Sequence, residues 1–145
     1  MKQITISDNH KKNILNTDFD HLQSLKTSDE NSPIILREIK KKYLSYKGQD
    51  KLKHKFDKEK HITFEELIEK LLECELKCYY CKKNMLLLYN KKRETLQWSL
   101  ERFNNNVGHY KDNTCIACLG CNLGRRTDNH EYYKKGKQLI LLKEV

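Results

Sequence analysis

Two pairs of cysteines, each with two residues between its members, constrain this chain more than any other feature. Cys78 and Cys81 form the first pair, Cys118 and Cys121 form the second, and 36 residues lie between the pairs. Tetrahedral zinc takes four soft donors, and a two-residue spacing lets one tight turn direct both thiolates at the same ion. We therefore predict a closed structural zinc site, with no open coordination position for chemistry.

Two further cysteines, Cys74 and Cys115, stand close to these pairs. Cys74 falls in the last turn of a predicted amphipathic helix, and Cys115 shares one face of a predicted strand with Ala117. Free cysteine behaves as a small hydrophobic residue, so we expect both thiols in the core. Disulfides are not expected, because nothing in the sequence argues for export.

The composition predicts one small domain, with or without a tail. Of the 145 residues, 37% are apolar and 34% are charged, so the core is thin and a bound metal is a plausible means of stabilising it. No apolar stretch approaches the roughly 20 residues of a membrane helix, and the amino terminus lacks the apolar block of a secretory signal. We therefore expect an intracellular protein.

Positive charge is concentrated in one segment. The chain carries a net charge of +9, and residues 37–60 hold ten basic and four acidic groups. This density suits a polyanion, because each neutralised phosphate releases counterions; the alternative is a solvated lysine-rich surface. Lysine outnumbers arginine 24 to 5, which favours backbone attraction over base reading. The residues predicted to bind nucleic acid are Lys40, Lys41, Lys42, Lys47, Lys51, Lys53, Lys55, Arg125 and Arg126.

The pattern along the chain predicts four regions. Residues 1–32 are a loosely ordered extension with a short helix near 14–25, and residues 33–60 are a basic helical arm. In this arm Pro33 opens a helix that runs to about Leu44, and Gly48 ends it. Residues 61–128 form a zinc-binding core, and residues 129–145 form a C-terminal helix.

Within the core, Thr63 and Glu66 fit a capping box, and apolar residues then recur at helical spacing to about 74–76. Leu96, Trp98 and Leu100 alternate with polar residues, which predicts a strand with one inward face. A loop over 104–108, a second strand over 114–117 and a helix over 119–126 follow.

The order of motifs suggests a family. The first cysteine pair is followed by Trp98-Ser-Leu-Glu101-Arg102, then by Gly108-His109-Tyr-Lys-Asp112-Asn113, and then by the second pair with Asn122 directly after it. This order resembles the zinc-containing HNH nucleases of the His-Me finger (ββα-metal) superfamily, over about residues 62–126. Residues 46–53 are similar to the basic lead-in of some phage and large-virus members.

The resemblance implies an α+β fold in which a β-hairpin and a helix, stapled by a four-cysteine zinc site, grip one Mg²⁺ or Mn²⁺ ion. It implies a metal-dependent endonuclease that hydrolyses DNA with modest sequence preference. A hard cation takes up charge on the scissile phosphate, and oxygen ligands suit it. By their places in the motif, Glu101 and Asn122 would bind that ion and Asn113 would brace the hairpin loop.

The first histidine of the family is expected at position 102, where this chain has arginine. His109 is then the nearby histidine that could serve as general base, and Arg102 could hold a phosphate oxygen. Each role has a structural alternative. Glu101 could pair with a lysine on a surface strand, Asn122 could cap a helix, and His109 could be a turn residue.

The alternative function is an HNH-like zinc module that has lost catalysis and binds nucleic acid or a protein partner, as the arginine at position 102 would predict. A plain zinc ribbon would lack the hairpin altogether. The endonuclease and the inactive HNH-like module differ in one observable feature. In an enzyme His109 should face Glu101 and Asn122, and in a binding module it should be turned away from them. The oligomeric state is open.

Overall fold

The structure, a computed structural model, describes residues 32–126 and 128–144. The predicted helix near 14–25 lies outside these residues. The elements in chain order are α3 (Ser32–Leu52), α4 (Phe64–Glu73), β1 (Trp98–Arg102), the 3-10 turn η1 (Lys111–Asn113), β2 (Thr114–Cys118), α5 (Leu119–Arg125) and α6 (His130–Glu144). This mixture confirms the predicted α+β class. No helix in the described ranges is both long and apolar enough to cross a bilayer.

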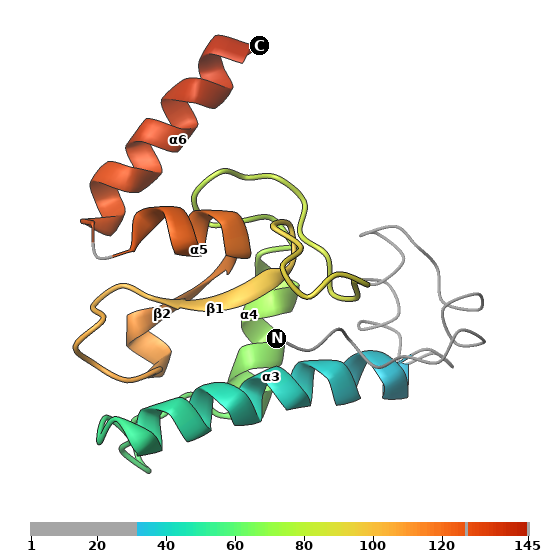
Figure 1. Cartoon of the computed structure of the whole chain (residues 1–145), viewed down its shortest axis with the longest axis vertical. Helices are drawn as coiled ribbons and strands as arrows, with labels where there is room; N and C mark the ends of the chain where they lie inside the picture. Colours follow the sequence, from blue (N-terminus) through green and yellow to red (C-terminus); the bar gives the residue numbers. More distant parts are fainter. Residues whose placement is uncertain (1–31, 127, 145) are drawn as a thin grey trace.

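An antiparallel hairpin of β1 and β2 forms the centre of the fold (Figure 1). Trp98 lies opposite Cys118, and Glu101 lies opposite Cys115. The hairpin loop is closed by Asn113, whose carbonyl accepts from the Phe103 N–H at 2.9 Å and whose Nδ2 donates to Gly108 O at 3.1 Å. The hairpin that a plain zinc ribbon would lack is therefore present.

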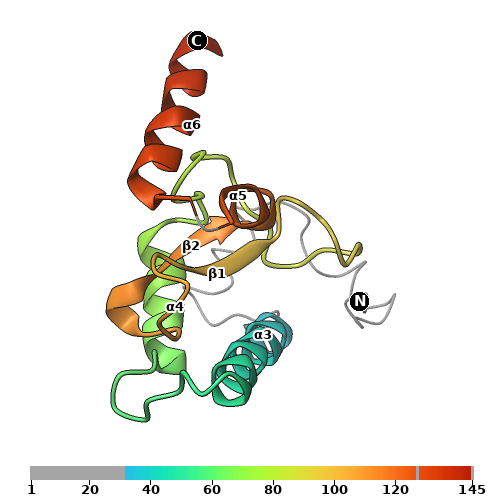
Figure 2. The same ribbon diagram turned by 60° about the vertical axis from the view of Figure 1, so that its left-hand side comes forward.

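Helices cover the hairpin on two sides. Figures 1 and 2 show α5 and α3 on opposite sides of the two strands. The prediction that β1 has only one inward face is wrong, because Ser99 and Glu101 are as buried as Trp98 and Leu100. Side chains of α5 bond to Ser99 and Glu101, so both faces of this strand are enclosed.

The prediction that Gly48 ends the first helix is also wrong, because α3 continues to Leu52. Ile35, Ile39 and Tyr43 form its buried stripe, and the stripe resumes beyond the glycine with Asp50. Glycine inside a helix costs about 1 kcal/mol relative to alanine. Packing of the residues on both sides of Gly48 offsets this cost, so tertiary contacts decide where the helix ends.

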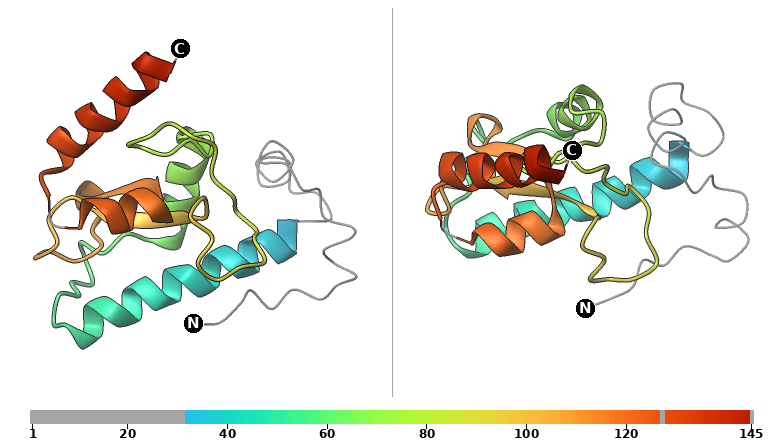
Figure 3. Two further views of the ribbon diagram at one scale, coloured as in Figure 1. Left: turned by 45° about the horizontal axis from the view of Figure 1, so that its top comes forward. Right: turned by 90° about the horizontal axis from the view of Figure 1, so that it is seen from above.

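The remaining helices follow the sequence pattern closely. Thr63 N donates to Glu66 Oε1 at 2.9 Å and Glu66 N donates to Thr63 Oγ1 at 3.1 Å, which confirms the capping box of α4. Helix α6 extends away from the hairpin (Figure 3, left). Its first turns are attached by ring contacts, His130 on Phe103 at 4.3 Å and Tyr133 on Tyr80 at 5.1 Å between centroids.

Candidate metal centre and hairpin site

The two cysteine pairs converge on one point. The Sγ atoms of Cys78, Cys81, Cys118 and Cys121 all lie within 4.8 Å of one another, and all four residues are buried. Four sulfur donors at this separation fit a tetrahedral ion such as zinc. The predicted quartet is therefore assembled, and a metal bound there would be closed to further ligands.

Backbone N–H groups donate hydrogen bonds to two of the four sulfurs. Cys78 Sγ accepts from the N–H groups of Tyr80 at 3.4 Å and Cys118 at 3.3 Å, and Cys118 Sγ accepts from Cys121 N at 3.4 Å. Hydrogen bonds from the Cys118 and Cys121 thiols lower the pKa of Cys78 far below its usual range. Lys82, with φ of 63°, lets the first pair turn tightly.

Cys74 and Cys115 stand apart from the quartet, as predicted. Cys115 is 7% exposed and Cys74 is half-buried, and both pack in or against the core. Burial raises the pKa of each thiol. Both therefore stay protonated and act as apolar side chains near neutral pH.

Two polar contacts fasten α5 to β1. Asn122 Nδ2 donates to Ser99 Oγ at 3.1 Å, and the Arg125 guanidinium meets Glu101 Oε1 at 2.9 Å. Glu101 is 3% exposed, so it is not a surface residue paired with lysine. Asn122 is not the helix cap, because Cys118 occupies that position.

Arg125 serves the fold and is not available to a phosphate. It is 2% exposed, and it donates to the carbonyls of Arg102 and Phe103 at 2.6 Å each and to Asp128 O at 2.8 Å. The prediction that Arg125 binds nucleic acid is therefore wrong. Its neighbour Arg126 is exposed.

Glu101 and Asn122 share one side of the hairpin, as their predicted role requires. Besides Arg125, the buried Glu101 carboxyl interacts with the Tyr80 hydroxyl. Burial raises the pKa of Glu101, opposed by hydrogen bonds with Tyr80 and Arg125 and by the charge of Arg125. Since the guanidinium already neutralises this carboxylate, the pair as it stands does not fit a divalent cation.

His109 lies on the other side, against α3. Its Nδ1 is 2.8 Å from Asp50 Oδ1, its backbone N–H donates to Asp50 Oδ2 at 2.6 Å, and its ring is 4.9 Å from that of Tyr46. Because a carboxylate only accepts, the proton is on Nδ1. Burial lowers the pKa of His109 to about 4, although Asp50 opposes this shift. The imidazole is therefore neutral at pH 7.

The predicted catalytic residues thus form two groups. Strand alternation places Arg102 on the side of Trp98 and Leu100, where its guanidinium donates to Val107 O at 3.3 Å. His109 and Arg102 belong to the α3 side, whereas Glu101 and Asn122 belong to the α5 side. The predicted base is thus bonded to α3, and the predicted metal ligands bond across β1 and α5.

The predicted lysines also divide. Lys42 Nζ donates to Trp98 O and lies 4.5 Å from the Trp98 ring centroid, and burial lowers its pKa to about 7. Lys55 Nζ donates to Asn105 O at 2.8 Å. Both hold the fold together, and Lys47 is half-buried beside Phe56. The predicted lysines with exposed side chains are Lys40, Lys41, Lys51 and Lys53.

Sequence reasoning missed Asp50, the buried partner of His109. It sits in a strongly basic segment, where an acidic residue suggests local charge balance. A helical reading that continued past Gly48 would have placed it on the stripe of Ile35, Ile39 and Tyr43. A carboxylate at a core-facing position predicts a buried polar partner.

We expect Cys81→Ser to abolish stoichiometric zinc binding and to unfold the turns that carry the four cysteines, because three thiolates hold the ion far less tightly. Cys74→Ser is the matched control and should keep one zinc per chain. Metal analysis of the purified proteins together with near-ultraviolet circular dichroism checks this. Equal zinc content in the two variants would contradict the assigned quartet.

We expect Arg125→Met to destabilise the protein by about 3–5 kcal/mol, because it leaves the Glu101 carboxylate buried without its partner. The exposed neighbour offers a control, and Arg126→Met should change the free energy of unfolding by less than about 0.5 kcal/mol. Urea unfolding of both variants with zinc bound measures this difference. Similar small losses would mean that the buried pair is not what fastens α5.

In comparisons with protein-family models, with curated proteins and with solved structures, none matched this chain. The likeness to HNH nucleases therefore rests on the residues named above and on their order along the chain.

Proposed function

We propose that this chain is a zinc-stabilised, HNH-like module that binds the phosphate backbone of nucleic acid. The exposed charge of residues 37–60 carries this proposal. Two of the four acids there, Glu38 and Asp50, are buried, and only Glu59 is exposed. Seven of the ten basic residues are exposed: Arg37, Lys40, Lys41, Lys51, Lys53, Lys58 and Lys60.

Folding therefore leaves seven basic groups and one acid facing solvent, so the segment keeps its positive charge at the surface although most of its acids are withdrawn. Glu38 pairs with Lys41 at 3.2 Å while its own side chain is withdrawn from water, and Asp50 is engaged by His109. Flexible lysines suit a polyanion whose charges are regularly spaced and not read base by base. DNA is the nucleic acid that the HNH resemblance favours.

We expect affinity for a DNA duplex to fall steeply with salt, because each phosphate contact contributes about −0.9 to the slope of log K against log salt. The double variant Lys51→Gln/Lys53→Gln should make that slope shallower by up to about 1.8. Fluorescence anisotropy with a labelled duplex measures it. The control Lys91→Gln/Lys135→Gln removes two exposed charges elsewhere, and an equal effect there would contradict the assigned surface.

A second candidate is endonuclease activity on DNA, which the Asp50–His109 pair favours. A carboxylate that fixes the Nδ1 proton leaves Nε2 as the basic nitrogen, as in a positioned general base. We rank this candidate second for three reasons. His109 is 3% exposed, its pKa of about 4 makes it a weak base, and Glu101 is neutralised by Arg125.

Incubation with supercoiled plasmid and Mg²⁺ or Mn²⁺ separates the two candidates. For a binding module we expect no nicked or linear product from the wild-type protein, from His109→Ala or from Asn122→Ala. Cleavage by the wild type that both variants lose would establish the endonuclease. Equal cleavage by all three would identify a contaminating nuclease.

A further inference from the structure

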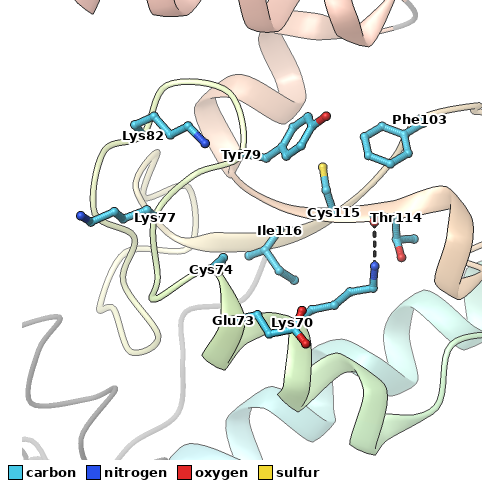
Figure 4. A pocket seen from close by; sticks show the side chains of 10 residues that line it. All are labelled: Lys70, Glu73, Cys74, Lys77, Tyr79, Lys82, Phe103, Thr114, Cys115 and Ile116. Carbon is cyan, nitrogen blue, oxygen red and sulfur yellow. Dashed lines mark hydrogen bonds between the residues drawn. The ribbon is translucent and has the colours of Figure 1, made fainter.

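The outer edge of β2 carries a pocket whose lining suggests a ligand. The pocket has a volume of about 480 Å³, which lies within the roughly 300–1,000 Å³ of small-ligand sites. It is lined by α4, by the first cysteine turn and by the start of the hairpin loop (Figure 4). We call it the β2-edge pocket, and its lining residues are Lys70, Glu73, Cys74, Lys77, Tyr79, Lys82, Phe103, Thr114, Cys115 and Ile116.

Two half-buried aromatic rings stand side by side in this pocket. The centroids of Tyr79 and Phe103 are 5.5 Å apart, and the rings are inclined by 60°. The ring of His130 contacts Phe103 in a tilted arrangement, with centroids 4.3 Å apart and an interplanar angle of 38°. Tyr79 and Phe103 meet edge to face and are only partly buried, so a planar ring in the pocket could stack on one of them and meet the edge of the other.

Cations surround the rings. Lys134 Nζ lies 4.0 Å and Lys82 Nζ lies 6.0 Å from the Tyr79 centroid, and Lys77 is exposed at the rim. Among the lining residues Glu73 is the single acid against three lysines. Aromatic platforms flanked by lysines are the usual means by which proteins hold an unpaired base together with its phosphate.

The edge of the strand is not suited to an added peptide strand. Thr114 O accepts from Lys70 Nζ at 2.9 Å, and Ile116 O accepts from Tyr79 N at 3.0 Å. These outward carbonyls are the groups that a docking strand would need. A ligand that stacks and carries negative charge fits this pocket better than an extended peptide does.

We propose that the β2-edge pocket binds one unpaired nucleotide of a single-stranded nucleic acid, with its base against Tyr79 and Phe103 and its phosphate near Lys77 and Lys82. This inference rests on the proposed function and adds a substrate class to it. A base inside a duplex has both faces covered by its neighbours, so only an unpaired nucleotide can use the platform.

The test uses the full chain with zinc bound and a labelled 12-nucleotide strand that contains 2-aminopurine. We expect binding to change the 2-aminopurine emission through stacking, and we expect the single strand to bind more tightly than its duplex. Phe103→Leu should weaken single-strand binding about tenfold and leave duplex binding unchanged. Tyr79→Phe keeps the ring and should bind normally. Zinc analysis of each variant checks that the four-cysteine site is intact.

A second pair of variants tests how the lysines of the pocket contribute to single-strand binding. Lys77→Gln/Lys82→Gln should weaken single-strand binding more than Lys91→Gln/Lys135→Gln does. Equal losses in the two double variants, or no change in 2-aminopurine emission on binding, would overturn the pocket assignment while duplex binding persists. If neither strand nor duplex binds at low salt, the proposed function itself fails. A parallel RNA strand shows which sugar the pocket prefers.

Discussion

The four-sulfur cluster is the constraint on which the rest of the structure depends. It joins the turn at 78–81 to the end of β2 and the first turn of α5. Helix α5 has only seven residues, far fewer than an isolated helix needs in water. Its position on the hairpin therefore comes from the cluster at one end and from Arg125 at the other. With α5 fixed in this way, the ion pair of Arg125 with Glu101 can be buried against β1.

Because helices enclose the hairpin on both sides, the side chains predicted for hydrolysis are held by protein partners. A hydrolytic centre of the HNH type needs its base and its metal-binding oxygens around one phosphate. Here Asp50 of α3 holds His109, and Arg125 of α5 holds Glu101. Each group has a protein partner where a nuclease would need it to face substrate. These contacts are our reason for proposing binding ahead of hydrolysis.

Local signals in the sequence were sufficient for much of the fold. The capping box at Thr63, the second strand and the choice of four cysteines among six each depend on residues within a few positions of one another. The errors concern tertiary partners. Gly48 lies inside a helix because residues on either side of it pack on the core. Arg125 and Lys42 looked like surface cations, but carbonyl groups distant in the chain, those of Arg102 and Trp98, bind them.

The basic segment and the β2-edge pocket lie at opposite edges of the hairpin, and the hairpin loop connects them. Tyr46 Oη accepts from Leu100 N at 3.1 Å, which places α3 along the outer edge of β1. The loop touches both surfaces, because Lys55 of the basic segment is bonded to Asn105 and Phe103 lines the pocket. A polymer that used both surfaces would have to follow this loop, and a flexible single strand bends more easily than a stiff duplex.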